Sequence, residues 1–365
     1  MKKNTTTNQS LSADVSACKV IAVDLAKRVF QVAGEDALGL VVYENRIKSR
    51  EAFHAFLRKL PATVTVLMET GPGAQAWARL LQAQGNCARI LPAQHVANHR
   101  SGPKNDRNDA LAILRAGRDL NISAVPVKSA AALAMQALHR VRQGYVRRRT
   151  AMGNQMRGLL LEHGVAMAQG EAAIKQVVAR ILEDATQPLP ELLRELVAEL
   201  LGEWNQLGER INVLTGRLET AAHNDETAKR LMTVRGVGPI ISTAVLAKQT
   251  EPERFANARQ FAAYFGLVPK QQSSGETIRL GKMSKHGDAY LRSLAIQGAH
   301  AVLRQVRSDS KHPDDRRLLR WLSRLGRKEA AVRLANRNLR IIWVLLQNDQ
   351  TYCGQLNNGL ESAMS

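Results

Sequence analysis

The stretch that decides the fold is KVIAVDLAKRVF, residues 19–30. Its apolar run at 20–23 predicts a buried strand, because a short, nearly continuous apolar segment fits a strand that is covered on both faces. Asp24 stands at the end of this run. A short polar connection then leads into a second predicted strand at 29–33. The carboxylate at the strand end is the first candidate functional group.

The same pattern recurs through the first third of the chain. Glu69 ends a β-branched run, as Asp24 ends the first. We expect further strands at 40–43, 63–68 and 87–91, and helices at 49–60 and 74–83. Strands that alternate with helices predict an α/β layer, in which the carboxyl ends of neighbouring strands form a site.

Two more acids lie in the motif KNDRND, residues 104–109. The alanines and leucines of 110–117 predict a helix, so Asp106 and Asp109, three residues apart, share one face of its first turn. A purely structural interpretation stays open, because acids are favoured at a helix N-terminus and Asp106 can act as its cap.

Taken together, the four carboxylates favour a metal site. Asp24, Glu69, Asp106 and Asp109 repel one another if they are gathered at one sheet edge without a cation. Hard oxygen ligands suit Mg²⁺ or Mn²⁺, and two such ions about 4 Å apart stabilise both oxygens of a phosphodiester exchange. A zinc site at His95 and His99 is a weaker candidate, since the sequence suggests no third ligand.

The charge of the chain favours a nucleic-acid partner. It has 52 Lys and Arg against 32 Asp and Glu, a net charge of +20. Residues 138–157 contain six arginines and no acid. A helix with this composition is expected to face phosphates, although a solvated basic face is the alternative. The candidate contacts in this segment are Arg140, Arg142, Arg147, Arg148 and Arg149.

A heptad pattern follows the prolines at 188 and 190. Apolar residues there alternate spacings of four and three, which predicts a coiled-coil arm for dimerisation or spacing. An intramolecular helical hairpin with residues 171–186 is the alternative. The seam consists of Leu193, Val197, Leu200, Trp204, Leu207, Ile211, Leu214 and Leu218.

The second half of the chain contains two further candidate contacts with phosphate. The motif VRGVGP at 234–239 is typical of a helix-hairpin-helix turn, in which Arg235, Gly236 and Gly238 approach a phosphate. A turn that only connects two helices is the alternative. A Gly- and Ser-rich loop at 269–286 has Ser273 and Ser274 at its tip, and behind them the cations Arg279, Lys282 and Lys285. Serines beside glycine are usually turn residues.

The remaining composition predicts a cytoplasmic protein. The three cysteines at 18, 87 and 353 are far apart and are expected to be reduced. No apolar run reaches the roughly 18 to 20 residues of a membrane span, and the polar start lacks the apolar core of a signal peptide.

Motifs in both halves of the chain together resemble the DEDD transposases of bacterial insertion sequences, relatives of the pilin-gene invertase. This family resemblance implies a RuvC-like, RNase H-type α/β domain at 18–125, a helical and coiled-coil segment at 126–226 and a mainly α transposase domain at 227–347, with tails at 1–17 and 348–365. The matching motifs are VDLAKRVF, METGPGAQAW, KNDRNDALAIL, LMTVRGVGPIISTAVLA, RFANARQFAAYFGLVPKQQSSGETIRLGKMSKHGDAYLR and ANRNLRIIWVLL.

The resemblance also implies roles for individual residues. The four acids, Asp24, Glu69, Asp106 and Asp109, bind Mg²⁺, and Ser274 forms a phosphoserine link to DNA, with Ser273 as the alternative nucleophile. The implied partners are double-stranded DNA, a non-coding bridge RNA and further copies of the chain, as a dimer or as a tetramer in the synapse.

Two other functions remain open from the sequence. A RuvC-like junction resolvase or nuclease would use water as its nucleophile. A dimeric architectural nucleic-acid-binding protein would need none of the acids. Because the family resemblance covers motifs in both halves of the chain, we expect a site-specific DNA recombinase that excises and inserts its element.

Overall fold

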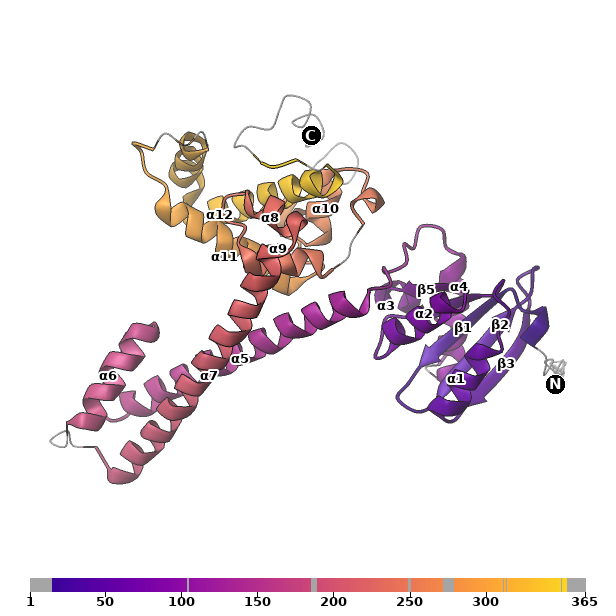
Figure 1. The fold of residues 1–365 in the computed structure, drawn as a ribbon, viewed down its shortest axis with the longest axis horizontal. Helices are drawn as coiled ribbons and strands as arrows, with labels where there is room; N and C mark the ends of the chain where they lie inside the picture. The colour runs from indigo at the N-terminus through magenta and orange to yellow at the C-terminus, as the bar shows by residue number, and fades with distance from the viewer. Residues whose placement is uncertain are drawn as a thin grey trace, which may run out of the picture. The chain divides into compact units, whose positions relative to one another are not determined.

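The structure is a computed structural model that divides into two compact units, Met1–Ala130 and Ala131–Ser365. These are the N-terminal and the C-terminal unit (Figure 1). The predicted boundary at 126 lies close to this division, and the predicted helical segment and transposase domain lie together in the C-terminal unit. The structure describes residues 15–103, 105–184, 189–248, 251–271, 279–310, 312, 314–348 and 350–352.

The N-terminal unit is built on a five-stranded mixed sheet, as the predicted α/β layer requires. The strand order is β3-β2-β1-β4-β5. β2 runs antiparallel to both β1 and β3, whereas β1, β4 and β5 are parallel. The strands differ from the predicted ranges by a few residues at their ends. They are β1 Val20–Leu25, β2 Phe30–Glu35, β3 Val41–Ile47, β4 Thr65–Glu69 and β5 Cys87–Leu91.

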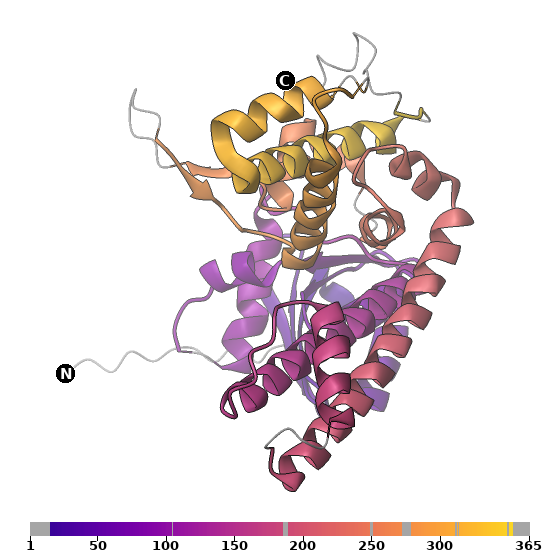
Figure 2. The same cartoon turned by 90° about the vertical axis from the view of Figure 1, so that its left-hand side faces the viewer.

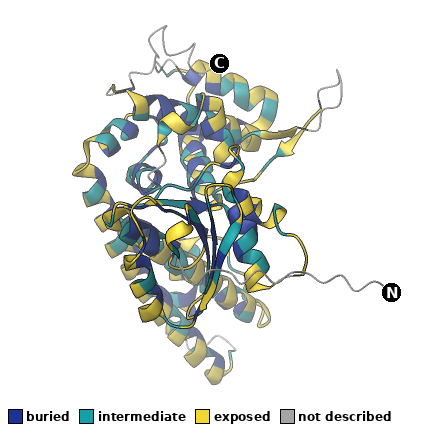
Figure 3. Ribbon diagram, turned by 90° about the vertical axis from the view of Figure 1, so that its right-hand side faces the viewer, coloured by how far each residue is buried: buried dark blue, intermediate teal, exposed yellow. Residues whose placement is uncertain are grey.

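Helices cover both faces of this sheet, and Figure 3 shows the buried strands between them in dark blue. The helices α1 (Arg50–Arg58) and α2 (Ala74–Ala83) pack on the face that carries Ile21 and Val23. The opposite face carries Ala22 and packs against α3 (Ala93–Asn98) and α4 (Asp106–Arg118). Side chains of a strand point alternately to the two faces, so one short apolar strand serves both helical layers.

Aromatic rings fill the layer between α1, α2 and the sheet. Phe30 and Phe53 stack with their centroids 4.1 Å apart, and Trp77 meets Phe53 edge-on at 4.9 Å. Phe30 and Phe53 are fully buried. Helix α1 begins where the sequence predicts, because the Ser49 hydroxyl accepts from the backbone N–H of Ala52 at 3.0 Å. Burial of these rings holds α1 and α2 on the sheet.

The other face is tightly packed because small residues line it. A Cβ atom at Gly117 of α4 would lie 2.1 Å from Leu67 Cδ1 in β4. Ala22 and Ala33 on the strands and Ala112 on the helix are also fully or almost fully buried. Helix α4 therefore lies close to the sheet, which places the first turn of the helix near the strand ends.

The C-terminal unit is mainly helical, as predicted. It also contains a small antiparallel hairpin, β6 Pro269–Gln271 with β7 Leu280–Met283, which extends from the helices (Figure 2). A short 3₁₀ turn lies at Pro252–Arg254, and the N-terminal unit has one at Val15–Ala17. The helices are α5 Ala130–Leu161, α6 Glu171–Glu183, α7 Glu191–His223, α8 Glu226–Met232, α9 Pro239–Leu246, α10 Ala258–Tyr264, α11 Ala289–Gln305 and α12 Asp315–Gln347.

The heptad seam of α7 packs within the chain. Val197 and Trp204 of α7 belong to one apolar cluster with Met156 of α5 and with Ile174 and Val178 of α6. The intramolecular hairpin is therefore the arrangement that the structure contains for this half of the seam. Helices α5 and α6 cover the apolar surface of α7 that a coiled coil between two chains would use in this half of the seam. The coiled-coil arm for dimerisation is not confirmed and stays a prediction.

The C-terminal end also departs from the expected tail at 348–365. Tyr352 is 9% exposed, and its hydroxyl accepts from Arg337 at 2.8 Å. Its backbone N–H donates to the Thr233 hydroxyl at 2.9 Å. Tyr352 thus belongs to the packed unit. Among the helices that the structure describes, none is long and apolar enough to span a bilayer.

We predict that Phe53→Ala destabilises the N-terminal unit by about 3–5 kcal/mol, because it removes a buried ring from the stack with Phe30 and leaves a cavity. Hydrogen exchange of the β1 and β4 amides in the full chain measures this loss. The matched control is Leu38→Ala, whose side chain is 84% exposed, with an expected effect within about 0.5 kcal/mol. Equal protection in the two variants would contradict the assignment of this core.

Candidate active site

The first two candidate carboxylates lie on neighbouring parallel strands. β1 and β4 pair in register up to Val23 and Met68. Asp24 and Glu69 are the next residue on each strand, and both side chains are partly exposed. The register of the parallel pair therefore places the two carboxylates side by side at the carboxyl edge of the sheet.

Helix α4 brings the other two acids to its first turn. Its N-cap is Asn105, whose side-chain oxygen accepts from the backbone N–H of Asn108 at 2.8 Å. Asp106 is therefore not the N-cap of α4, and the alternative that Asp106 serves as the helix cap is wrong. Asp106 and Asp109 lie in the first turn of a helix that packs on β1 and β2.

The electrostatics of Asp24 show that the four acids lie near one another. The pKa of Asp24 is raised from 3.8 to about 6, first by burial and then by the negative charges of Asp109, Asp106 and Glu69, in that order. Arg100 acts in the opposite direction. A carboxylate surrounded by three others holds its proton more tightly, because a further negative charge is repelled. Residues from three separate elements thus act on a single group.

Arginines partly neutralise the cluster. Arg100 Nε donates to Asp109 Oδ1 at 2.5 Å, and Arg46 lies 3.5 Å from Asp106. In the described part of the chain, no three His, Cys, Asp or Glu side chains are arranged tightly enough to hold an ion as they stand. The donor set nevertheless fits one, since carboxylate oxygens are the ligands that Mg²⁺ and Mn²⁺ prefer.

Comparison with known proteins identifies the group to which the chain belongs. A DEDD transposase model of the IS110 group matches residues 21–164, and the model described as "Transposase IS116/IS110/IS902 family" matches residues 228–313. A Coxiella burnetii protein, "Transposase for insertion sequence element IS1111A", is 36% identical over 92% of both chains. The chain belongs to the IS110/IS116 family of DEDD insertion-sequence transposases.

Two further relatives match nearly the whole of this transposase. "Probable family 20 transposase" of Pseudomonas aeruginosa is 41% identical over 91% of this chain and 98% of its own. "Transposase for insertion sequence element IS1328" of Yersinia enterocolitica is 33% identical over 89% of this chain and 96% of its own. Membership of the family implies an enzyme that cuts and rejoins DNA in transposition, and one that works with divalent metal ions.

The predicted nucleophile of the transposase, Ser274, and its neighbour Ser273 lie outside the described residues. The described parts of the predicted loop are the strands of the β6–β7 hairpin. Arg279, Lys282 and Lys285 are all exposed on or beside β7. The hairpin was missed at the sequence level because two strands of three and four residues are too short to show a period.

The arginines predicted on α5 fall into two groups. Arg140, Arg147 and Arg148 are exposed. Arg142 instead donates to the Thr215 hydroxyl at 2.7 Å. Arg149 lies over the Trp204 ring at 3.9 Å and pairs with Glu171 at 2.7 Å. These contacts hold the helices of the C-terminal unit together, and the charge of Arg149 is paired within the chain, whereas Arg140, Arg147 and Arg148 are exposed.

The VRGVGP turn connects α8 and α9 and packs on α11. Gly236 has a φ of +90°, and a Cβ there would lie 2.8 Å from Val302 Cγ2. Arg235 forms an ion pair with the buried Asp315. Gly238 is the N-cap of α9. The close approach of the turn to α11 explains why residue 236 is a glycine. Gly236 is therefore also consistent with the alternative, a turn that only connects two helices.

The sequence did not indicate Arg46 and Arg100 as partners of the acids. Arg46 lies on β3 and Arg100 follows α3, each far in the chain from Asp24. Only the folding of the sheet brings these cations to the cluster, and neither stands in a motif. A lone arginine at such a position carries no signal in one sequence.

We predict that Asp24 titrates near pH 6 in the metal-free protein. The folded state keeps this proton between about pH 4 and 6, where an ordinary aspartate in the unfolded chain has lost it. The stability of the metal-free protein therefore falls as the pH rises through this window. Carboxyl ¹³C NMR of the full chain measures the titration midpoint.

The variant Asp109→Asn should lower this midpoint, since it removes the largest repelling charge and releases Arg100. Its control is Glu51→Gln on α1, an acid that is absent from the charges that shift Asp24. A midpoint near pH 4 in the unaltered protein would refute the clustering of the acids.

Proposed function

We propose that this chain excises and inserts its insertion sequence by cutting and rejoining DNA at a site made of Asp24, Glu69, Asp106, Asp109 and Ser274. The single observation that supports this best is the raised pKa of Asp24, which comes from its burial and from the charges of three other carboxylates on two further elements. Acids that serve only solubility are not gathered at the expense of mutual repulsion. The five-stranded sheet, with β1 and β4 parallel at its centre, supports an RNase H-like assignment for residues 18–125.

The four carboxylates are the proposed ligands of two Mg²⁺ or Mn²⁺ ions. When bound, such ions stabilise the negative charge on the attacking and leaving oxygens of a phosphodiester exchange. The chain contributes the placement of the ligands. The β1–β4 register fixes Asp24 beside Glu69, and the cap at Asn105 fixes the turn that carries Asp106 and Asp109.

Ser274 is the proposed nucleophile. Its oxygen forms a bond to a DNA phosphorus as the bond from that phosphorus to the adjoining DNA oxygen breaks. The serine loses its hydroxyl proton, and the released DNA oxygen takes up a proton as the end of the free strand. One phosphoester replaces another, so the energy of the cut bond is retained and the reverse attack rejoins a strand.

The proposed partners are double-stranded DNA at the element ends and target, a bridge RNA and further copies of the chain. The net charge of +20 and the exposed arginines Arg140, Arg147 and Arg148 support a polyanionic partner. The guide RNA rests on the family resemblance alone. A dimer, or a tetramer in the synapse, would provide one site for each strand to be cut.

A nuclease that uses water is the second candidate function. The acid cluster supports it equally, because two-ion sites also activate water. The two functions differ in one product: only the recombinase leaves DNA covalently attached to the protein.

We therefore predict that Ser274→Ala abolishes a covalent protein–DNA adduct that the unaltered chain forms with its element ends, flanking RNA and Mg²⁺. Denaturing gel electrophoresis detects the adduct, and peptide mass spectrometry maps the linked residue. Ser273→Ala is the matched control and should retain the adduct. If Ser274→Ala still cuts DNA at the rate of the unaltered chain, the nuclease is the correct function.

We also predict that Asp24→Asn lowers the rate of adduct formation by a factor of about 100 or more, because loss of a shared metal ligand costs roughly 3 kcal/mol of transition-state stabilisation. The control is Asp36→Asn, an acid in the turn between β2 and β3 that binds the backbone of Leu38 and Leu40. Single-turnover kinetics with Mg²⁺ measure the rates. Equal rates for the two variants would argue against a metal site at the sheet edge.

A further inference from the structure

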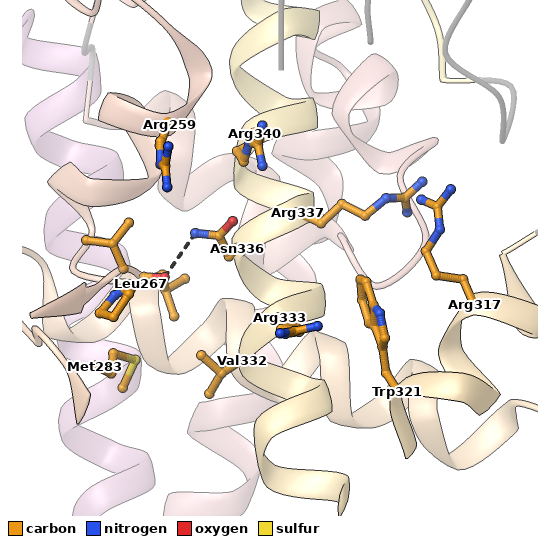
Figure 4. Close-up of a pocket in the computed structure, with 12 residues that line it drawn as sticks. Arg259, Leu267, Met283, Arg317, Trp321, Val332, Arg333, Asn336, Arg337 and Arg340 are labelled. Carbon is orange, nitrogen blue, oxygen red and sulfur yellow. Dashed lines mark hydrogen bonds between the residues drawn. The ribbon is translucent and has the colours of Figure 1, made fainter. Parts of the chain in front are cut away.

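The C-terminal unit contains a groove of about 730 Å³, apart from the acid cluster of the N-terminal unit. It lies between α10, α12 and the base of the β6–β7 hairpin (Figure 4). Five of its twelve lining residues are arginines, and no acid lines it among the described residues. The lining arginines are Arg259, Arg317, Arg333, Arg337 and Arg340.

Most of this positive charge is not neutralised within the chain. Among the described residues, no Asp or Glu forms an ion pair with Arg259, Arg317, Arg333 or Arg340. The buried Nε of Arg340 has no hydrogen-bond partner there either. Burial and the charge of Arg259, which lies across the groove in Figure 4, lower the pKa of Arg340. The groove thus holds guanidinium groups that repel one another and leave donors unused.

Other polar side chains hold the shape of the groove. Arg337 pairs with the buried Asp314 at 3.0 Å and donates to the Tyr352 hydroxyl at 2.8 Å. Asn336 Nδ2 donates to the backbone carbonyl of Leu267 at 2.9 Å, which ties α12 to the chain just before β6. The wall is therefore fixed by paired groups, whereas the unpaired guanidiniums face a space large enough for a ligand.

Two unpaired arginines share one face of the second half of α12, after the break in the helix at Gly326. Arg333 and Arg340 are seven residues apart, which is two helical turns, so their side chains follow the groove in line. Arg259 on α10 approaches from the other wall. Trp321 adds a flat apolar surface to the lining. A row of guanidiniums with an aromatic ring beside it is typical of a surface that follows a nucleic-acid strand.

We propose that this groove binds the phosphodiester backbone of a nucleic-acid strand through Arg259, Arg333 and Arg340. The inference rests on the proposed function and adds to it a binding surface at the base of the β6–β7 hairpin. Pro269 of β6 and Met283 of β7 line the groove, and Ser274 follows Gln271 by three residues in the sequence. The groove is therefore lined in part by the two strands whose connection carries the proposed nucleophile in the sequence.

The test compares two double variants of the full chain that remove the same charge. Arg333→Gln/Arg340→Gln removes groove arginines, and Arg320→Gln/Arg324→Gln removes two exposed arginines from the first half of α12, outside the lining. Fluorescence anisotropy measures the affinity for single-stranded DNA and, separately, RNA of about 20 nucleotides over a range of salt. Circular dichroism establishes that each variant is folded.

We expect the groove variant to bind about tenfold more weakly than the unaltered chain and the control to change less than about twofold. The slope of log affinity against log salt should fall in magnitude by about 1.4, since each phosphate contact with a single strand contributes about 0.7. Arg333→Lys/Arg340→Lys keeps the charge but not the two-pronged donors, so its affinity should lie between the two. A loss for DNA alone, or for RNA alone, identifies which strand occupies the groove.

Equal losses in the two double variants, or no loss in either, would overturn the groove as a site, because binding would then reflect general charge. This result would leave the adduct formed through Ser274 intact. Conversely, absence of the adduct in the unaltered chain would refute the proposed function, while the comparison of affinities would still decide whether the groove binds a strand.

Discussion

Repulsion between carboxylates at one edge of a sheet is the constraint on which the N-terminal unit depends. The parallel pairing of β1 with β4 sets Asp24 beside Glu69, and the packing of α4 on the same strands adds Asp106 and Asp109. Burial raises the pKa of Asp24, and the charges of these three acids raise it as well. An arrangement with this electrostatic cost needs compensation, and either the protein's own cations or bound metal ions can provide it.

The arginines near the acids suggest how the two forms of compensation are related. Arg100 is bound to Asp109 and Arg46 lies near Asp106, so two of the four proposed ligands already have a cationic partner. If Asp109 bound a metal ion, its ion pair with Arg100 would be replaced by coordination of the metal. Arg100 and Asp109 are both partly buried, so the metal-free cluster is a state with its own ion pair.

The sequence predicted the strands better than the surfaces. The run before Asp24 and its repeat before Glu69 are long enough to show that strands end in acids, and the register then follows from parallel pairing. The heptad of α7 was predicted equally well as a pattern, but a pattern of apolar residues does not name the partner helix. In the structure Trp204 meets Arg149 of the same chain, and Val197 packs with residues of α6. Which helices cover a seam depends on loop paths that one sequence does not display.

Arginine shows the same limit more sharply, since its function depends on its neighbours. Arg149 and Arg235 stand in basic motifs that favoured phosphate contacts, yet both are paired within the chain, with Glu171 and Asp315. Arg333 and Arg340 were not among the predicted phosphate contacts, yet they remain without an acid in the described structure. The density of positive charge along the sequence therefore does not locate a binding surface. A binding surface is indicated instead by positive charge that has no acidic partner after folding. Such charge binds a polyanion favourably, because binding releases the counterions of the polyanion.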